Sequence, residues 1–396
     1  MKRHLVALLL VVVACSPYLV RGQSFSSGAQ VTSNASASEP PKPYRLVRTI
    51  PLPFLKEMSG QLGYDQENGR LFFSDGKDLD IVNASDGQRV GLASKIRRAS
   101  DIAFAPDIHR AFIADSDSRA LFAMDLSTLT VVQKINVGAE SWSVLYDPDT
   151  KKVFTTGVSS STCKVFDAGA GKQIGSVKLH GYPLRAASDS HGHIYFNLAS
   201  TNPGTPLLEA PGVLVTPTPL PLKSDLAELD TRTLFMGNRW NEPSCAFLSL
   251  MGIDQSGQDL VLGCQNSVKL MDRQTRKIVA SAAITGVRPV ASLIFSSSLG
   301  DVFLLGLDEQ PDSHRRKMVI VHEDSSGHLG PAMLAPQLLV LPGAFDGAKQ
   351  QFFTLQSETT TVDTGLFMQV PGGQMTHLRV PRPIPGTFRI VVYSRN

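Results

Sequence analysis

Seven charged or aromatic residues stand at the entry to apolar, strand-like segments in the first three quarters of the chain. Side chains of both charges that converge from separate segments can bind a small anionic or zwitterionic ligand. They can equally form salt bridges with one another around a water-filled channel. The seven candidate ligand-binding residues are Glu57, Arg98, Asp101, Glu140, Trp142, Arg185 and Arg288.

Local motifs for catalysis or metal binding are missing from the sequence. It contains no Gly-x-Ser-x-Gly, His-Glu-x-x-His, phosphate-binding glycine loop or haem-attachment Cys-x-x-Cys-His. His191-Gly192-His193 is the one close histidine pair, and strand alternation would place both rings on one face as a metal contact. No Cys or carboxylate cluster accompanies it, so a turn is the better interpretation. His314, His322 and His328 are scattered, and we predict no metal and no cofactor.

The elements that must position these residues follow a repeat. An apolar strand that ends in Asp or Asn and runs into a polar turn occurs five times, at intervals of 42, 42, 63 and 42 residues. A fixed period near 42 indicates one supersecondary unit copied along the chain. Asp and Asn open such turns because their side chains can hydrogen-bond the backbone two residues on. The turn-opening residues are Asn83, Asp125, Asp167, Asp230 and Asp272.

Each unit also carries an upstream hairpin of two apolar strands, such as residues 102–107 and 110–115. Four short strands in about 42 residues is the size of one propeller blade. The sequence therefore predicts an all-β fold, a seven-bladed β-propeller of four-stranded blades. The 63-residue interval predicts an insertion at about 201–224, between two strands of blade four. The seven hairpin landmarks are Asp65, Asp107, Asp147, Asp189, Asp254, a position near Ser297, and Asp346.

Ring closure has two interpretations. Residues 44–51 resemble a fourth strand without its first three, so they would complete the last blade and pin the chain ends together. Residues 376–380 and 388–393 also have strand character, and one of them would compete for that place. We predict a propeller over residues 44–396 in either case.

The strand–Asp–turn–strand phrase resembles the YVTN-type (YncE-like) β-propeller repeat family. The closest copy is Leu-Met-Asp-Arg-Gln-Thr-Arg-Lys-Ile-Val at 270–279, whereas the usual Tyr-Val-Thr-Asn phrase is degraded to Phe-Thr-Thr-Gly at 154–157. The resemblance covers about residues 45–330 well and the last 65 poorly. It implies the fold more strongly than a function. In such a propeller, the seven candidate residues would line the mouth of the central channel.

The repeat and the missing catalytic motifs favour a non-enzymatic binding or scaffold protein, with a protein, peptide or glycan partner at the cell envelope. The alternative is a lactonase-like hydrolase, since some similar propellers hydrolyse sugar lactones with convergent side chains at the mouth. Its candidates would be Glu57, Arg98, Glu140 and Arg185, so enzymatic activity stays open. A third possibility is an electron-transfer partner subunit, which would need a neighbouring cofactor subunit.

Residues 1–22 resemble a secretory signal peptide. Lys2 and Arg3 precede an apolar run at 5–13 that is too short to span a bilayer. Cleavage before Gln23 competes with a lipoprotein signal at Cys15, so the membrane would be reached only through a lipid on Cys15. Residues 23–43 are Ser-, Ala- and Pro-rich and predict a disordered linker. A periplasmic or extracellular location follows, secreted or lipid-anchored.

Cleavage before Gln23 also removes three basic residues and no acid, so the formal charge of +3 becomes 0. Some members of the resembled family are reported to touch DNA. A neutral mature chain gives no support for nucleic-acid binding, and we predict none.

Two of the four cysteines are placed to pair. Cys245 and Cys264 flank a predicted hairpin with its turn at about 254–257, and an oxidising compartment would permit a disulfide. Two small buried thiols are the alternative. Cys163 has no evident partner in the sequence.

Overall fold

The computed structural model describes residues 44–200, 224–242, 245, 250–254, 256–264, 266–285, 287–296, 300–308, 316–335, 343–369 and 375–395. The chain divides into units 1–37 and 38–396, and every described residue belongs to the second. This part is all-β, with two 3₁₀ turns, η1 (Pro106–Ile108) and η2 (Gly138–Glu140), and no α-helix. None of its elements is a helix long and apolar enough to cross a membrane. The predicted signal, the linker and residues 201–223 of the predicted insertion lie outside it.

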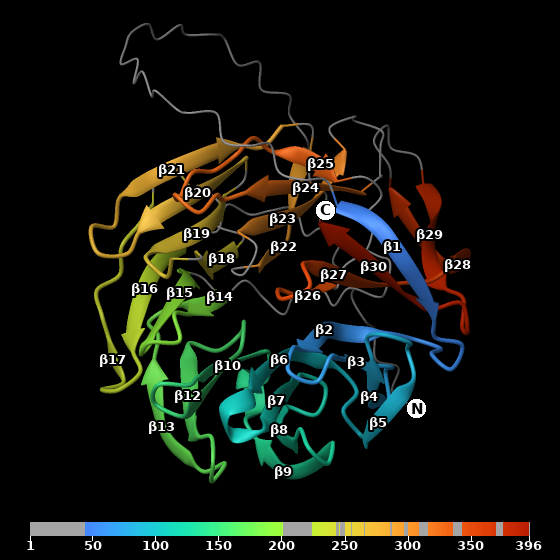
Figure 1. Cartoon of the computed structure of the whole chain (residues 1–396), viewed down its shortest axis with the longest axis horizontal. Helices are drawn as coiled ribbons and strands as arrows, with labels where there is room; N and C mark the ends of the chain where they lie inside the picture. Colours follow the sequence, from blue (N-terminus) through green and yellow to red (C-terminus); the bar gives the residue numbers. More distant parts are fainter. Residues whose placement is uncertain are drawn as a thin grey trace, which may run out of the picture. The chain divides into compact units, whose positions relative to one another are not determined.

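Within these ranges, the strands form five four-stranded sheets, one eight-stranded sheet and one two-stranded hairpin. The eight-stranded sheet consists of two antiparallel halves, β2–β5 and β6–β9, joined by one parallel pair between Gly60 and Ala99. Each sheet or half is named below by its first strand: β2, β6, β10, β14, β18, β22 and β26. Figure 1 shows them following one another around a common centre, with these first strands innermost. First strands contact in order from β26 through β2 and on to β22.

The first six sheets or halves are built from the same short antiparallel strands. The β2 and β6 halves contain β2 (Ser59–Asp65), β3 (Arg70–Ser74), β4 (Asp78–Asn83), β5 (Arg89–Ser94), β6 (Ala99–Ala105), β7 (Arg110–Asp115), β8 (Ala120–Asp125) and β9 (Thr130–Asn136). The β10 and β14 sheets contain β10 (Ser143–Asp147), β11 (Lys152–Thr156), β12 (Thr162–Asp167), β13 (Gln173–Lys178), β14 (Tyr182–Ser188), β15 (His193–Ala199), β16 (Ser224–Asp230) and β17 (Phe235–Met236). The β18 and β22 sheets contain β18 (Leu250–Ile253), β19 (Asp259–Cys264), β20 (Ser267–Asp272), β21 (Ile278–Ala283), β22 (Val287–Ser296), β23 (Asp301–Asp308), β24 (Arg316–His322) and β25 (Met333–Ala335).

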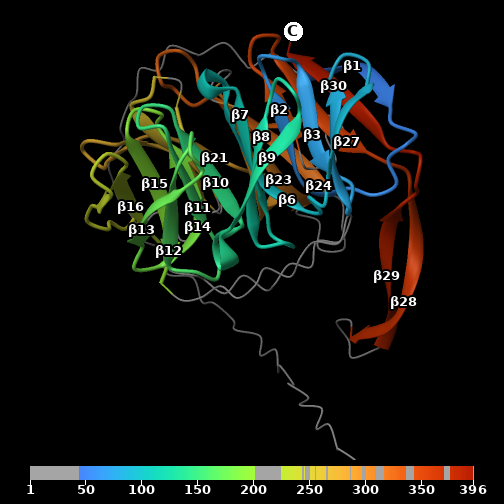
Figure 2. The same cartoon turned by 90° about the horizontal axis from the view of Figure 1, so that it is seen from below.

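The last strands close the fold. They are β1 (Tyr44–Pro51), β26 (Gly343–Asp346), β27 (Gln351–Gln356), β28 (Thr359–Gln369), β29 (Met375–Pro383) and β30 (Arg389–Arg395). The order β26-β27-β30-β1 makes β1 the fourth strand of the last sheet, which confirms the prediction for residues 44–51. The two competing segments do not take this fourth place. Residues 389–393 of one segment belong to β30, the third strand of the sheet, and residues 376–380 belong to β29, which pairs with β28 in a separate hairpin (Figure 2).

The core lies between the sheets. Large aromatic side chains on second strands are fully buried, because neighbouring sheets cover both faces of these strands. Leu260 and Leu262 take this role on β19. The aromatic members are Phe72, Phe112, Phe154, Phe196, Phe303 and Phe352.

The repeated turn is structural, as predicted. Asp125 Oδ1 accepts the N–H groups of Ser127 and Thr128 at 2.9 and 2.8 Å. Asp230 Oδ1 accepts two backbone N–H groups in the same way, each at 2.8 Å. These carboxylates end the third strand of their sheets and fix the tight connection to the fourth.

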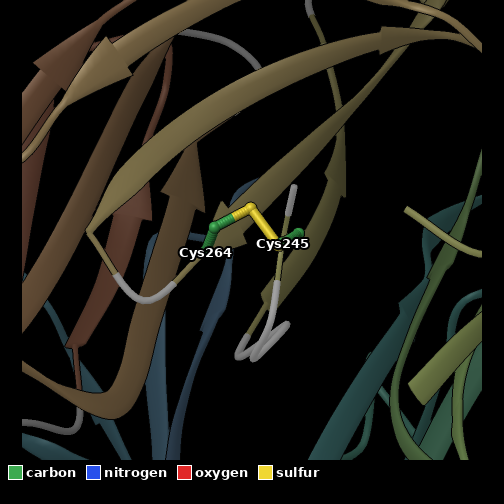
Figure 3. Close-up of a disulfide and its surroundings, with 2 residues drawn as sticks. All are labelled: Cys245 and Cys264. Carbon is green, nitrogen blue, oxygen red and sulfur yellow. A yellow bond between two sulfur atoms is a disulfide. The ribbon is translucent and has the colours of Figure 1, made fainter. Parts of the chain in front are cut away.

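Cys245 and Cys264 form a disulfide, with their Cα atoms 5.1 Å apart (Figure 3). The bond ties the segment ahead of β18 to the end of β19, so the hairpin-flanking interpretation was right. Cys163 is a free and buried thiol. Burial, followed by the charge of Glu140, raises the pKa of that thiol.

Candidate functional site

The seven predicted mouth residues lie on or beside first strands. Glu57, Arg98, Glu140 and Trp142 precede β2, β6 and β10, as expected. The other three lie inside first strands and not in the entry loops as predicted, because the extended backbone of the strand begins before these positions. They are Asp101 in β6, Arg185 in β14 and Arg288 in β22, and the side chain of Arg288 lies outside the described part.

Two of these charges are compensated inside their own sheets. Arg98 Nε lies 3.2 Å from Asp117 Oδ1, in the turn that follows β7. Glu140 Oε2 lies 3.3 Å from Lys164 Nζ, and its Oε1 accepts the Ser160 hydroxyl at 2.7 Å. Such local pairs do not bring Arg98 and Glu140 together at one point.

Asp101 links two sheets. Its Oδ2 accepts the Ser143 hydroxyl at 2.7 Å and the Val144 N–H at 3.0 Å, so it joins β6 to β10. Burial raises the pKa of Asp101, although these hydrogen bonds and the charge of Arg185 oppose the rise. Glu57, by contrast, is exposed, with its carboxylate against Gly76 in the β3–β4 turn. Arg98, Glu140 and Glu57 therefore make separate local contacts, whereas Asp101 and Arg185, from β6 and β14, are close enough for their charges to interact.

A polar cleft of about 590 Å³ opens between the β14 and β18 sheets. Its walls come from the β14–β15 turn, from β15 and β16, and from the turns after β18 and β20. Histidine, carboxylate, amide, phenol and guanidinium groups all face it. The lining residues are Asp189, His191, His193, Tyr195, Glu228, Gln258, Asp272, Arg273, Gln274 and Arg276.

Asp189 and Arg273 form an ion pair among the residues that line the cleft. Arg273 Nη1 lies 2.6 Å from Asp189 Oδ2 and 3.2 Å from the Tyr195 hydroxyl. Burial would raise the pKa of Asp189, but the backbone N–H groups of His191 and His193 and the Arg273 guanidinium outweigh it and lower that pKa. Asp189 is therefore ionised, and its charge is already paired with Arg273.

His193 and Glu228 lie close together in the cleft. His193 Nδ1 lies 3.2 Å from Asp189 Oδ2, and because an ionised carboxylate only accepts, Nδ1 carries the proton. Its Nε2 lies 3.8 Å from Glu228 Oε1. Glu228 accepts the Tyr195 hydroxyl at 3.2 Å and pairs with no Lys or Arg of the described ranges. Burial, followed by the charge of Glu228, raises the pKa of Tyr195 to about 12.

Sequence reasoning noticed the histidine pair but missed the cleft. His191 lies in the turn before β15, as the preferred interpretation had it, and His193 is the first residue of that strand. No group of three or more His, Cys, Asp or Glu side chains able to hold a metal occurs within the described ranges. The available signal was the residue that follows each turn-opening Asp: Arg273 follows Asp272 and reaches the neighbouring sheet.

No protein-family model matches the chain, and no curated protein is significantly similar to it. Among solved structures, the chain is similar to Kuenenia stuttgartiensis hydrazine synthase, with a TM-score of 0.55 and 11% identity over 89% of this chain and 99% of that chain. It is also similar to a chain in the crystal structure of the mitotic checkpoint complex, with a TM-score of 0.55 and 13% identity over 84% and 95%. At these identities the likeness concerns the fold alone, and it supports a β-propeller.

Proposed function

We propose that this chain is a non-enzymatic binding propeller that captures a cationic side chain of a protein or peptide in the cleft between the β14 and β18 sheets. The observation that carries the proposal is the Glu228 carboxylate, which lines the cleft, lies 3.8 Å from His193 Nε2 and has no Lys or Arg partner in the described ranges. A carboxylate only accepts hydrogen bonds, and an ammonium or guanidinium group supplies several N–H donors and a complementary charge.

The charge of the cleft agrees with this ligand class. Asp189 is neutralised by Arg273, whereas Glu228 is half-buried and has no Lys or Arg partner in the described part of the chain. Charge-assisted hydrogen bonds to a group already held in place are stronger than neutral ones. The Tyr195 hydroxyl fixes the Glu228 carboxylate before a ligand arrives, which lowers the ordering cost of binding.

Peptides that contain Lys or Arg test the proposal by calorimetric titration of the full chain. A matched set would carry norleucine or citrulline at the same position, which removes the charge and keeps the length. We expect micromolar or tighter binding of some cationic peptides and a loss of about 10-fold or more for Glu228→Gln, since a charged hydrogen bond contributes about 1.5–3 kcal/mol.

Glu67→Gln, an exposed acid in the β2–β3 turn, is the matched control and should bind normally. Equal affinity for the citrulline peptides, or normal affinity of Glu228→Gln, would contradict the cleft. The triple variant Arg98→Ala, Arg185→Ala, Arg288→Ala tests the channel mouth. Loss of binding in that variant alone would move the site there.

The finer identity and setting of the protein are part of the same proposal. We infer a seven-bladed propeller of the YVTN type, with the eight-stranded sheet counted as two blades. The support is the two antiparallel halves joined by one parallel pair, together with the 42-residue repeat. The signal-like residues 1–22 favour a place at the cell envelope, where a protein or peptide partner would be met. Fractionation of cells that express the full chain, with Cys15→Ala as the lipid-anchor control, tests that location.

A further inference from the structure

Neighbouring sheets are joined by a recurring contact. An Asp in the turn after a first strand receives a hydrogen bond from the next sheet. The Tyr64 hydroxyl donates to Asp346 at 2.7 Å, and the Tyr146 hydroxyl donates to Asp107 at 2.8 Å. An ionised carboxylate can only accept, so each of these boundaries needs a donor from the facing sheet.

At two boundaries the donor is the residue that directly follows a third strand. Thr231 follows β16, and its hydroxyl donates to Asp147 of the β10 sheet. Arg273 follows β20, and its guanidinium donates to Asp189 of the β14 sheet at 2.6 Å. The two donors differ in chemistry but occupy the same place in their sheets.

Glu323 occupies this place in the β22 sheet, directly after β24. Backbone hydrogen bonds establish the equivalence, because each of the three residues donates its N–H to the turn between the first two strands of its own sheet. The bonds run from Thr231 to the Gly192 carbonyl at 2.8 Å, from Arg273 to Gln258 at 3.2 Å and from Glu323 to Gly300 at 2.7 Å. The β22 sheet therefore has a carboxyl group at the position where the β14 sheet has the hydroxyl of Thr231 and the β18 sheet has the guanidinium of Arg273.

The groups that face Glu323 are acids. Asp254 comes from the β18–β19 turn of the preceding sheet, Asp259 begins β19 of that sheet, and Asp324 comes from the loop of Glu323 itself. Asp324 lies 3.6 Å from His328 Nδ1, and no Lys or Arg of the described ranges acts on Glu323. The Glu323 side chain belongs to a residue only 2% exposed, and its Oε2 has no hydrogen-bond partner within those ranges.

We propose that Glu323 carries a proton in the folded chain, at the boundary between the β18 and β22 sheets. Loss of this proton weakens the boundary, because the ionised carboxylate would then face other acids. Burial, and then the charges of Asp254, Asp259 and Asp324, raise the pKa of Glu323 to about 7. Its folded pKa thus lies above the unfolded value of 4.5. The stability from this group is complete below pH 4.5 and is lost as the pH rises through 7.

The boundary shares a turn with the cleft. Arg273 donates to the carbonyl oxygens of Gly257 and Gln258, in the same β18–β19 turn that presents Asp254 to Glu323. Loosening this turn removes two acceptors of Arg273, an arginine that lines the cleft. The proton on Glu323 is therefore placed to control the order of one cleft wall.

Urea unfolding of the full chain between pH 4 and pH 8 tests the inference, with Glu323→Gln as the isosteric neutral variant. The wild-type folding constant should fall by as much as about 300-fold more than that of the variant across this range, as the two pKa values imply. Glu323→Gln should be the more stable protein at pH 8. Glu67→Gln, exposed in a turn, should keep the wild-type slope.

Equal pH slopes for wild type and Glu323→Gln would overturn the proposal. So would stabilisation of the wild type, but not of the variant, by calcium at pH 8, because the acids would then hold a cation and not a proton. Hydrogen exchange gives a second readout. The amide of Glu323, bound to Gly300, should lose protection above pH 7 in the wild type more than in the variant.

Discussion

The hydroxyl of Tyr44 donates to Asp301 Oδ2 across 2.6 Å, although 257 positions separate the two residues. Asp301 also lies 2.9 Å from His322 Nδ1 and 3.4 Å from Arg395 Nη1. One buried carboxylate thus gathers side chains from β1, β24 and β30, and joins the β22 sheet to the sheet that holds both ends of the described chain. Phe303 and Phe352 stack beside it, with ring centroids 5.2 Å apart.

Tyr44→Phe should lower the free energy of unfolding by about 2 kcal/mol, because a hydrogen bond to a charged group contributes about 1.5–3 kcal/mol. The ring contact with Phe303 stays in place, so the loss reports the hydroxyl. Chemical denaturation measures it. Tyr182→Phe is the control, since that hydroxyl makes no hydrogen bond within the described ranges. A Tyr44→Phe protein as stable as the wild type would show that the closure does not depend on this bond.

Asp189→Asn should destabilise the chain by about 3 kcal/mol at pH 7, because Arg273 loses a buried counter-charge. The pKa of Asp189 is lowered on folding, so its contribution is present above the ordinary value of 3.8 and disappears as the pH falls through the lower folded value. The difference between wild type and variant should therefore shrink in acid. A pH series of urea midpoints checks this, and a difference that grows on acidification would refute it.

Gly60→Ala should destabilise the junction between the β2 and β6 halves by several kcal/mol. A Cβ there would lie 2.2 Å from the Ala99 carbonyl oxygen, and the backbone at Gly60 has a φ of +86°. Gly257→Ala is a matched control, with a φ of +73° and no heavy atom within 4 Å of the added carbon in the described part. The control should show only the cost of the left-handed backbone, roughly 1 kcal/mol. Thermal unfolding compares the two, and equal losses would rule out the steric contact.

Removal of the disulfide should cost about 3 kcal/mol. Cys245 and Cys264 are 19 positions apart, and closing a loop of this length in the unfolded chain contributes about that amount. The double variant Cys245→Ser, Cys264→Ser should unfold at the same urea concentration with and without a reductant, whereas the wild type should shift. If the wild type unfolds at the same urea concentration with and without the reductant, the disulfide adds no stability.

The repeat was readable from the sequence because it depends on local chemistry. Asp125 and Asp230 open turns with their own side chains, and the alternation of short apolar runs and turns fixes the strands around them. The place of residues 44–51 was also readable, since a lone strand needs a sheet with a free edge. Cys245 and Cys264 were recognisable as candidate partners because they flank one predicted hairpin.

The candidate site was not readable in this way, because its contacts join sheets. Asp189 and Arg273 are 84 positions apart, and neither is unusual in its own turn. The partners of the predicted mouth residues were likewise decided by the tertiary structure. Arg98 pairs with Asp117 and Glu140 pairs with Lys164, each within its own sheet.

By itself, the sequence determined the all-β class, the repeating unit and the turns, because hydrogen bonds between near neighbours decide these. Only the tertiary structure decided which turn meets which side chain at each sheet boundary. There Thr231 and Arg273 each donate a hydrogen bond to an Asp of the neighbouring sheet, whereas the charge of Asp254 raises the pKa of Glu323. Burial and charge act through space and not along the chain, so the same position in three sheets acquires three different chemistries.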